Sequence, residues 1–291
     1  MCTVVIAAHN EGLVIGACLD ALLLDADVGE FEVVVAANGC TDDTAQAAAR
    51  DGVTVIELTE ADKAAALNAA EQVATRYPRI YLDADVRLST RSVRALRDAV
   101  TATPGEAPPA LAAMARRDLQ LRGRPLPIRA YFAINSHHPA YTGSLFGRGA
   151  VALSAEGRAR FDQFPLMQAD DLFLDSLFAP SEKAEVSEAV SSVATPWRTR
   201  DLLQRLERVR RANHQLRVSV GAGSGPAPGA FAGRSDRWAW LREVVVPRPW
   251  LAPSAVVYVA ITLVAEMRAT RQPDLLGWGQ DESTRSAHAH S

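Results

Sequence analysis

The chain has 291 residues, a formal net charge of −3 and 48% hydrophobic residues, which is an ordinary globular composition. This composition excludes a wholly disordered chain and a collagen-like chain, and three cysteines are too few for a disulfide-rich scaffold. The near balance of charge gives no global basic field, so we expect no nucleic-acid partner.

The N-terminus leads from Met1 into an apolar run, Val4–Ala8, without a basic segment before it. This start predicts that no secretory signal is present. An odd number of cysteines is typical of a reducing compartment. We therefore expect a cytoplasmic protein.

The first 100 residues alternate short apolar runs with helical patterns. Continuous apolar runs predict buried strands, at Val4–Ala8, Phe31–Ala36, Val53–Leu58 and Ile80–Leu82. Apolar residues at helical spacing predict helices between them, over 12–24, 44–50, 63–76 and 90–100. Strands that alternate with helices of this length predict a parallel α/β sheet with right-handed crossovers.

The pattern is looser beyond residue 101. Strands are predicted at Leu111–Ala115 and Leu145–Leu153, and helices at Asp171–Phe178 and 199–217. The segment 119–142 is predicted to be irregular.

The C-terminal part begins with a stretch rich in Gly, Ala and Pro, which predicts a flexible linker over 218–236. An apolar helical segment follows at 237–272, with its most apolar part at Ala255–Ala265, and the polar tail 273–291 is predicted to be disordered. Because no run of 18 apolar residues occurs, we expect no ordinary membrane-spanning helix.

Polar residues follow three of the predicted strands, at His9-Asn10-Glu11, at Asn38–Asp43 and at Asp83-Ala84-Asp85. Ligands of open α/β sheets bind beyond the carboxyl ends of the strands. Turns and helix caps would also place polar residues there, but their joint appearance favours a binding edge. The sequence has no dinucleotide fingerprint after the first strand, no P-loop, no nucleophile elbow and no zinc-ligand spacing.

Asp83 and Asp85 are the sharpest feature of this edge. Two carboxylates on alternate residues just past a strand can hold a hard divalent ion that also binds a diphosphate. A solvated loop would have the same short pattern. The helical segment that starts at Lys63 and the acidic pair Asp170-Asp171 favour the metal interpretation.

In these motifs the chain resembles the family 2 inverting glycosyltransferases with the GT-A fold. The resemblance covers about residues 1–217 and rests on a set of segments in the family's order, at 4–11, 33–44, 63–68, 81–85, 143–144 and 169–172. It implies an α/β, Rossmann-like, mostly parallel central sheet flanked by helices, with a C-terminal helical appendage. It also implies a catalytic domain over 1–217, with a nucleotide-binding half, 1–100, and an acceptor half, 101–217.

The resemblance implies a role for each matching residue. The nucleotide of the donor would contact six positions: Ala8, Asn10, Glu11, Asn38, Lys63 and Asp83. Asp85 would bind Mg²⁺ or Mn²⁺, with His214 as a candidate further ligand. Asp171 would be the catalytic base, in a pair with Asp170 where the family usually has Glu-Asp.

The chain departs from the family pattern at Ala37-Asn38-Gly39-Cys40, where the family often has Asp-Asp-Gly-Ser. The acidic group that commonly recognises uracil is therefore absent, so a UDP-sugar is favoured only slightly over other donors. The Gln-x-x-Arg-Trp signature of processive synthases is also missing, which favours a single addition by a hexosyltransferase-like enzyme.

The helix predicted at 199–217 is rich in arginine. Arg208 and Arg211 on it are candidate contacts of the donor diphosphate, because arginine binds phosphate through paired donors. A solvated helix face and an anionic membrane surface are the other interpretations of this helix.

The apolar helix near the C-terminus has two interpretations. It packs on the catalytic domain or on the partner in a homodimer, or it lies in the membrane interface and serves a lipid-linked acceptor. The second interpretation would make the protein peripheral at the inner face of the membrane.

Two rival functions stay open. A haloacid-dehalogenase-like phosphatase has an Asp-x-Asp after an apolar strand, but it needs a lysine between that motif and the later acidic pair, and no lysine lies between 86 and 169. A non-catalytic nucleotide-sugar-binding module on the same fold is the second rival.

Overall fold

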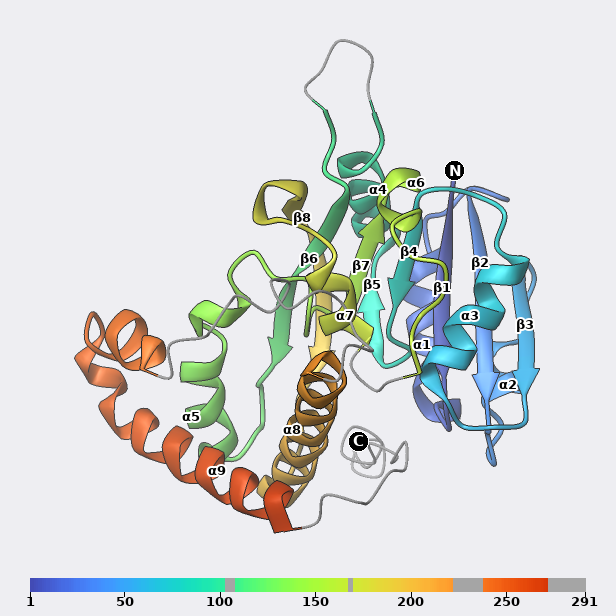
Figure 1. Cartoon of the computed structure of the whole chain (residues 1–291). Coiled ribbons are helices and arrows are strands. Elements are labelled where there is room, and N and C mark those ends of the chain that lie inside the picture. The colour runs from blue at the N-terminus through green and yellow to red at the C-terminus, as the bar shows by residue number, and fades with distance from the viewer. Residues whose placement is uncertain (103–107, 167–169, 222–237, 272–291) are drawn as a thin grey trace. The chain divides into compact units, whose positions relative to one another are not determined.

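The computed structural model describes residues 1–102, 108–166, 170–221 and 238–271, and Figure 1 traces the chain. These residues form two compact units, each described by itself. Unit 1 consists of Met1–Leu119 and Leu145–Ala194, and unit 2 of Gln120–Ser144 and Thr195–Ser291. The predicted linker, 218–236, and the predicted tail, 273–291, lie almost entirely outside the described residues.

Unit 1 is built on an eight-stranded sheet with the order β3-β2-β1-β4-β7-β6-β8-β5. The strands are β1 (Cys2–Ala8), β2 (Phe31–Asn38), β3 (Val53–Leu58), β4 (Arg79–Leu82), β5 (Val86–Leu88), β6 (Ala112–Gln120), β7 (Ala150–Leu153) and β8 (Lys183–Ala194). Strands β1 to β4 pair in parallel, whereas β7 pairs antiparallel with both β4 and β6, and β5 antiparallel with β8. The predicted α/β class, with a central sheet flanked by helices and a C-terminal helix, is confirmed, but the parallel part of the sheet is limited to β1 to β4.

Helices cover both faces of this sheet (Figure 1). They are α1 (Gly12–Leu23), α2 (Thr44–Ala48), α3 (Lys63–Val73), α4 (Thr90–Ala99), α6 (Ala155–Arg158) and α7 (Asp170–Ser176). Side chains of β1 alternate between the two faces: Val4 and Ile6 pack into a core with α1, α2 and α4, and Val5 into a core with α3 and α7. This alternation is what a strand buried on both sides requires.

Unit 2 is helical in its described part. Its main elements are α5 (Leu126–Asn135), α8 (Thr199–Gly221), a six-residue π-helix (Trp240–Val245) and α9 (Ala252–Arg271). Helix α9 packs against both α5 and α8 (Figure 1). Tyr131 of α5 stacks on Tyr258 of α9 with ring centroids 5.2 Å apart. Arg210 of α8 pairs with Glu266 of α9 at 2.8 Å.

Three expectations for local structure were wrong. The segment 119–142, expected to be irregular, contains α5, because Pro125 and Pro127 lie at the start of the helix, where proline is tolerated. Strand β8 was not predicted, since its sequence mixes Lys, Glu and Ala with few large apolar residues. The strand expected over Leu145–Leu153 begins only at Ala150.

Helix α9 has 20 residues, which lie within the apolar helical segment predicted at 237–272 and extend beyond its most apolar part, Ala255–Ala265. Within the described residues, Pro249–Arg271 is by length and composition able to cross a membrane, since its most apolar 18-residue window has a mean hydropathy of 1.6. Isolated polar residues interrupt the apolar run but not the helix, which corrects the expectation that no segment reaches this length.

Candidate functional site

The ends of β1 and β2 are joined by hydrogen bonds between the two loops that follow them. Asn10 has a positive φ of 54°, and its Oδ1 accepts hydrogen bonds from the backbone N–H groups of Thr41 at 2.7 Å and Asp42 at 3.3 Å. The backbone N–H of Glu11 donates to Thr44 Oγ1 at 2.7 Å. Asn10 therefore shapes this edge, where Glu11 is partly exposed and Ala8 is buried at the end of β1.

Asn38 is the last residue of β2 and is fully buried. Its Nδ2 donates to the carbonyl oxygens of Ala8 at 2.9 Å and Ala36 at 3.3 Å. Its Oδ1 has no hydrogen-bond partner within the described part of the chain. The neighbouring backbone oxygen of Asn38 lies 2.7 Å from His9 Nδ1.

The acidic residues meet at Lys63, the first residue of α3. Its Nζ lies 2.9 Å from Asp83 Oδ1 and 3.0 Å from Asp170 Oδ2. Burial lowers the pKa of Lys63, but the two carboxylates outweigh it and raise that pKa well above its usual value. Lys63 is therefore a cation held between two segments that are far apart in the sequence.

Asp83 is fixed by its backbone just past β4. Its N–H donates to the carbonyl oxygen of Gly149 at 3.0 Å, and its own carbonyl oxygen accepts from Val86. Burial raises the pKa of the Cys18 thiol in α1 to about 12, and the charges of Asp85 and Asp83 add to this effect. The carboxylates of Asp83 and Asp85 are therefore both close enough to Cys18 to affect the pKa of its thiol.

Asp171 lies in the first turn of α7. Its Oδ2 accepts a hydrogen bond from the backbone N–H of Gly147 at 2.8 Å. Burial, with repulsion from Asp170, raises the pKa of Asp171 to about 6, against the opposing effects of Gly147 and Lys63. The carboxyl is therefore mostly ionised at neutral pH, with a pKa near the range that suits a general base.

The glycine-containing loop before β7 was not among the predicted site residues. Gly147 and Gly149 both have positive φ, 66° and 72°. Their backbones bond to Asp171 and Asp83 respectively. The loop is also tied to α7 because Leu145 N–H donates to Asp175 Oδ1 at 2.7 Å. The close spacing of glycines at 143, 147 and 149 was the sequence signal for such a loop.

Asp83 and Asp85 offer carboxylate oxygens at this edge, which is the ligand type that a hard divalent ion takes. Among the described residues, no group of three or more His, Cys, Asp or Glu side chains is arranged to hold a metal by itself. Magnesium in such sites usually takes one or two protein carboxylates, and the substrate phosphates and water supply the rest. Asp85 and Asp83 are two such carboxylates.

The remaining candidates lie on α8 of unit 2. Arg211 pairs with Glu207 at 3.4 Å, and Glu207 also lies 3.4 Å from Arg268 of α9. Arg208 is half-buried, and the side chain of His214 lies outside the described residues. The roles of Arg208, Arg211 and His214 at a donor site stay predictions.

Comparison with known proteins supports the family resemblance. Residues 3–107 match the model of the glycosyl transferase family 2. No curated protein matches the chain significantly. The resemblance inferred from the sequence motifs is confirmed over the matched residues.

Two solved structures share the fold. The mannosyltransferase PcManGT from Pyrobaculum calidifontis, in complex with GDP-Man and Mn²⁺, is 23% identical, with a TM-score of 0.57 over 92% of this chain and 78% of that one. TarS 1–349 from S. aureus, in complex with UDP-GlcNAc, is 14% identical, with a TM-score of 0.52 over 94% and 93%.

Proposed function

We propose that this chain, whose residues 3–107 match the model of glycosyl transferase family 2, moves a sugar from a nucleoside diphosphate sugar to an acceptor hydroxyl. The transfer is a single addition with inversion at the anomeric carbon. The observation that carries the proposal is the meeting of Asp83 and Asp170 at Lys63, with Asp171 next to them. This puts an acidic strand end, a cation and a candidate base into one site of unit 1.

Asp171 is the proposed general base. Its carboxylate takes the proton of the acceptor hydroxyl, and the freed oxygen attacks the anomeric carbon from the side opposite the diphosphate. The bond from that carbon to the diphosphate oxygen breaks, and its electron pair leaves with the nucleoside diphosphate. Gly147 N–H holds the carboxylate in position for the step, at 2.8 Å.

Asp170 and Lys63 support this base. Asp170 keeps Lys63 beside the site and raises the pKa of Asp171 by repulsion. Lys63 is the proposed contact of the ribose and diphosphate, because its charge can offset that of the leaving group. Asp85, with Asp83, would hold Mg²⁺ or Mn²⁺, an ion that neutralises a diphosphate leaving group when it is bound.

The nucleoside is proposed to lie along the ends of β1 and β2, against Ala8, Asn10, Glu11 and Asn38. The Oδ1 of Asn38 has no partner among the described residues, but it is buried, so the base can reach it only if the residues over it move. PcManGT is in complex with GDP-Man and TarS with UDP-GlcNAc, so these two structures of similar fold hold nucleotides with different bases. On the sequence alone, a UDP-sugar is slightly favoured as the donor.

The acceptor and the setting of the reaction are further parts of the proposal. The exposed apolar residues of α9 support a lipid-linked acceptor, and they equally support a homodimer through this helix. Cys2, Cys18 and Cys40 are free thiols, in agreement with a reducing, cytoplasmic setting.

Asp171→Asn tests the function directly. The amide keeps the size of the side chain but cannot take the proton, so transfer to acceptor should fall by about 100-fold or more while donor affinity persists. Radiolabelled transfer measures the first quantity and calorimetric titration of the nucleotide the second. Asp162→Asn, an exposed carboxylate outside the site, is the matched control.

Retained transfer in Asp171→Asn would remove the base assignment. Nucleotide binding by the wild-type chain without transfer to any acceptor would instead favour the non-catalytic binding module. A product with the donor's anomeric configuration would contradict the single displacement.

A further inference from the structure

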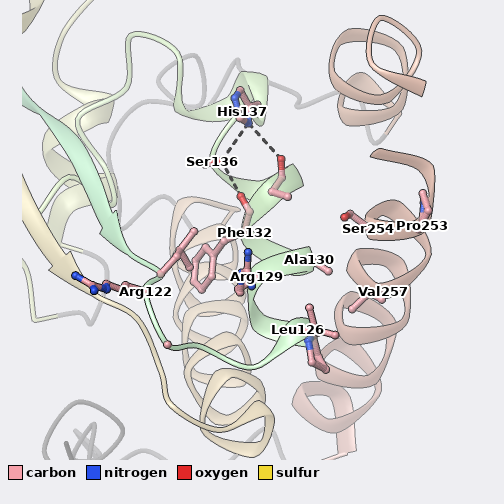
Figure 2. A pocket seen from close by; sticks show the side chains of 14 residues that line it. Arg122, Leu126, Arg129, Ala130, Phe132, Ser136, His137, Pro253, Ser254 and Val257 are labelled. Carbon is pink, nitrogen blue, oxygen red and sulfur yellow. Dashed lines mark hydrogen bonds between the residues drawn. The ribbon is translucent and has the colours of Figure 1, made fainter. Parts of the chain in front are cut away.

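We propose that α5 and α9 of unit 2 form a groove that binds a membrane lipid with an anionic phosphate head group. The groove has a volume of about 980 Å³, at the upper end of the range for ligand pockets. Figure 2 shows Leu126 and Ala130 of α5 facing Val257 of α9 across it. This proposal goes beyond the sugar transfer and does not depend on it.

The lining suits a hydrocarbon chain. Most of its side chains are apolar, including Leu126, Phe132 and Val257. Leu126, the first residue of α5, is 76% exposed. An apolar chain in the groove would remove this side chain from water, at roughly 25 cal/mol for each Å² of apolar surface buried.

The polar members of the lining are basic or neutral. Arg122 precedes α5, Arg129 lies on it, and His137 follows it, whereas none of the lining residues is acidic. Within the described residues, neither Arg122 nor Arg129 has a salt-bridge partner. Two exposed guanidiniums beside an apolar groove complement a phosphate on a hydrocarbon chain, since each can donate paired hydrogen bonds to phosphate oxygens.

A second surface of α9 also favours a membrane lipid as the ligand. Its buried residues face α5 and α8, and the opposite side of the helix carries an exposed apolar stripe of Trp250, Pro253, Val256, Ala260, Leu263 and Met267. Trp250 and Val256 are each 71% exposed. Pro253 belongs to both the stripe and the groove lining, so the two surfaces are continuous. A bilayer that supplies the lipid would also cover the stripe.

A second copy of the chain is the competing occupant. In a twofold dimer through this surface, each arginine would approach the arginines of the other copy, because such interfaces pair a patch with itself. The absence of acidic residues in the groove lining leaves those charges uncompensated. The charge pattern therefore favours the lipid.

Flotation of the full-length chain with vesicles tests the proposal, with phosphatidylcholine vesicles that either contain or lack phosphatidylglycerol. Wild type should float with the anionic vesicles. The double variant Arg122→Glu/Arg129→Glu should bind them at least about tenfold more weakly, because the phosphate contacts are lost. The double variant Arg91→Glu/Arg116→Glu changes the net charge equally at exposed residues of unit 1 and should bind as wild type does.

Ala133→Trp separates the groove from the stripe, because it fills the groove from α5 and leaves both the charge and the stripe unchanged. It should weaken flotation while thermal unfolding shows that the variant is folded. Flotation equal to wild type in Ala133→Trp or in Arg122→Glu/Arg129→Glu would overturn the proposal. So would binding that ignores phosphatidylglycerol, or vesicle-free self-association that Leu263→Gln abolishes.

Discussion

At the scale of single residues, Asp171 is the carboxyl group whose pKa the site raises. Burial and the neighbouring Asp170 raise its pKa to about 6, whereas Gly147 and Lys63 act in the opposite direction. A base must be ionised to accept a proton, so activity should be lost as the pH falls through this value. We expect kcat/KM to be level above pH 7 and to fall about tenfold per pH unit well below 6.

Asp170→Asn tests the origin of that pKa. Without the neighbouring charge, the pKa of Asp171 should fall, and the acid limb of the kcat/KM profile should move to lower pH. Asp162→Asn should leave the limb in place, since Asp162 is exposed and is not among the groups that shift the pKa of Asp171 most. An acid limb that stays at the same pH in Asp170→Asn would show that burial alone sets it.

Sequence patterns identified the acidic members of this site but not its geometry. Asp83, Asp85 and the pair Asp170-Asp171 stand out by their order and type. That Lys63 pairs with both Asp83 and Asp170 depends on how α3 and α7 pack in the folded sheet, and no local pattern encodes that. Gly147 contributes through its backbone, so its side-chain type reveals only that a special conformation is needed.

At the scale of elements, the junction between β4 and β7 fixes the acidic edge. Gly149 has a φ of 72°, and a Cβ built on it would lie 2.6 Å from Val86 Cγ2. Its carbonyl oxygen also receives the N–H of Asp83. A side chain at Gly149 would therefore disturb the loop that holds Asp83.

A comparison of the free energies of unfolding of Gly149→Ala and Gly29→Ala measures this effect. Gly29 has a similar φ of 74° but nothing within 4 Å of the added Cβ, so its variant reports only the cost of the backbone conformation, about 1–2 kcal/mol. Gly149→Ala should lose at least about 1 kcal/mol more in urea unfolding, from the overlap with Val86. Equal losses in the two variants would mean that the loop moves aside freely.

The burial of each strand and helix explains which parts of the fold could be predicted. Strands β1, β2 and β4 are continuous apolar runs because they are buried on both faces. Strand β3 is only partly buried but keeps apolar residues such as Val55 and Ile56, and helices α1 to α4 have apolar residues at helical spacing because each is buried on one face. Strand β8 instead alternates buried residues such as Val186 and Ala189 with Glu and Ser, and its small residues give no strong strand signal. Helix α5 was hidden by the two prolines at its start.

At the scale of the whole molecule, donor binding should appear as a gain in stability that depends on a metal. We expect one of UDP, GDP, dTDP and CDP to raise the melting temperature with Mn²⁺ and less with EDTA. A nucleotide at 100 times its Kd adds about 2.7 kcal/mol to the free energy of unfolding.

Asp85→Ala should abolish the part of this gain that needs the metal, because Asp83 alone cannot hold a diphosphate-bound ion. Asp162→Ala, which removes an exposed carboxylate elsewhere, should keep the full gain. A full Mn²⁺-dependent shift in Asp85→Ala would show that the ion is held by other groups.

The chain enters unit 2 twice, at Gln120–Ser144 and again from Thr195, and this has an evolutionary consequence. A gene recombined anywhere within the codons for residues 145–194 would encode α5 from one parent and α8 with α9 from the other. Tyr131 and Tyr258, which stack across that division, would then come from different ancestors. We expect exchanges between related genes to spare this interval, and substitutions on α5 to be matched by compensating substitutions on α9.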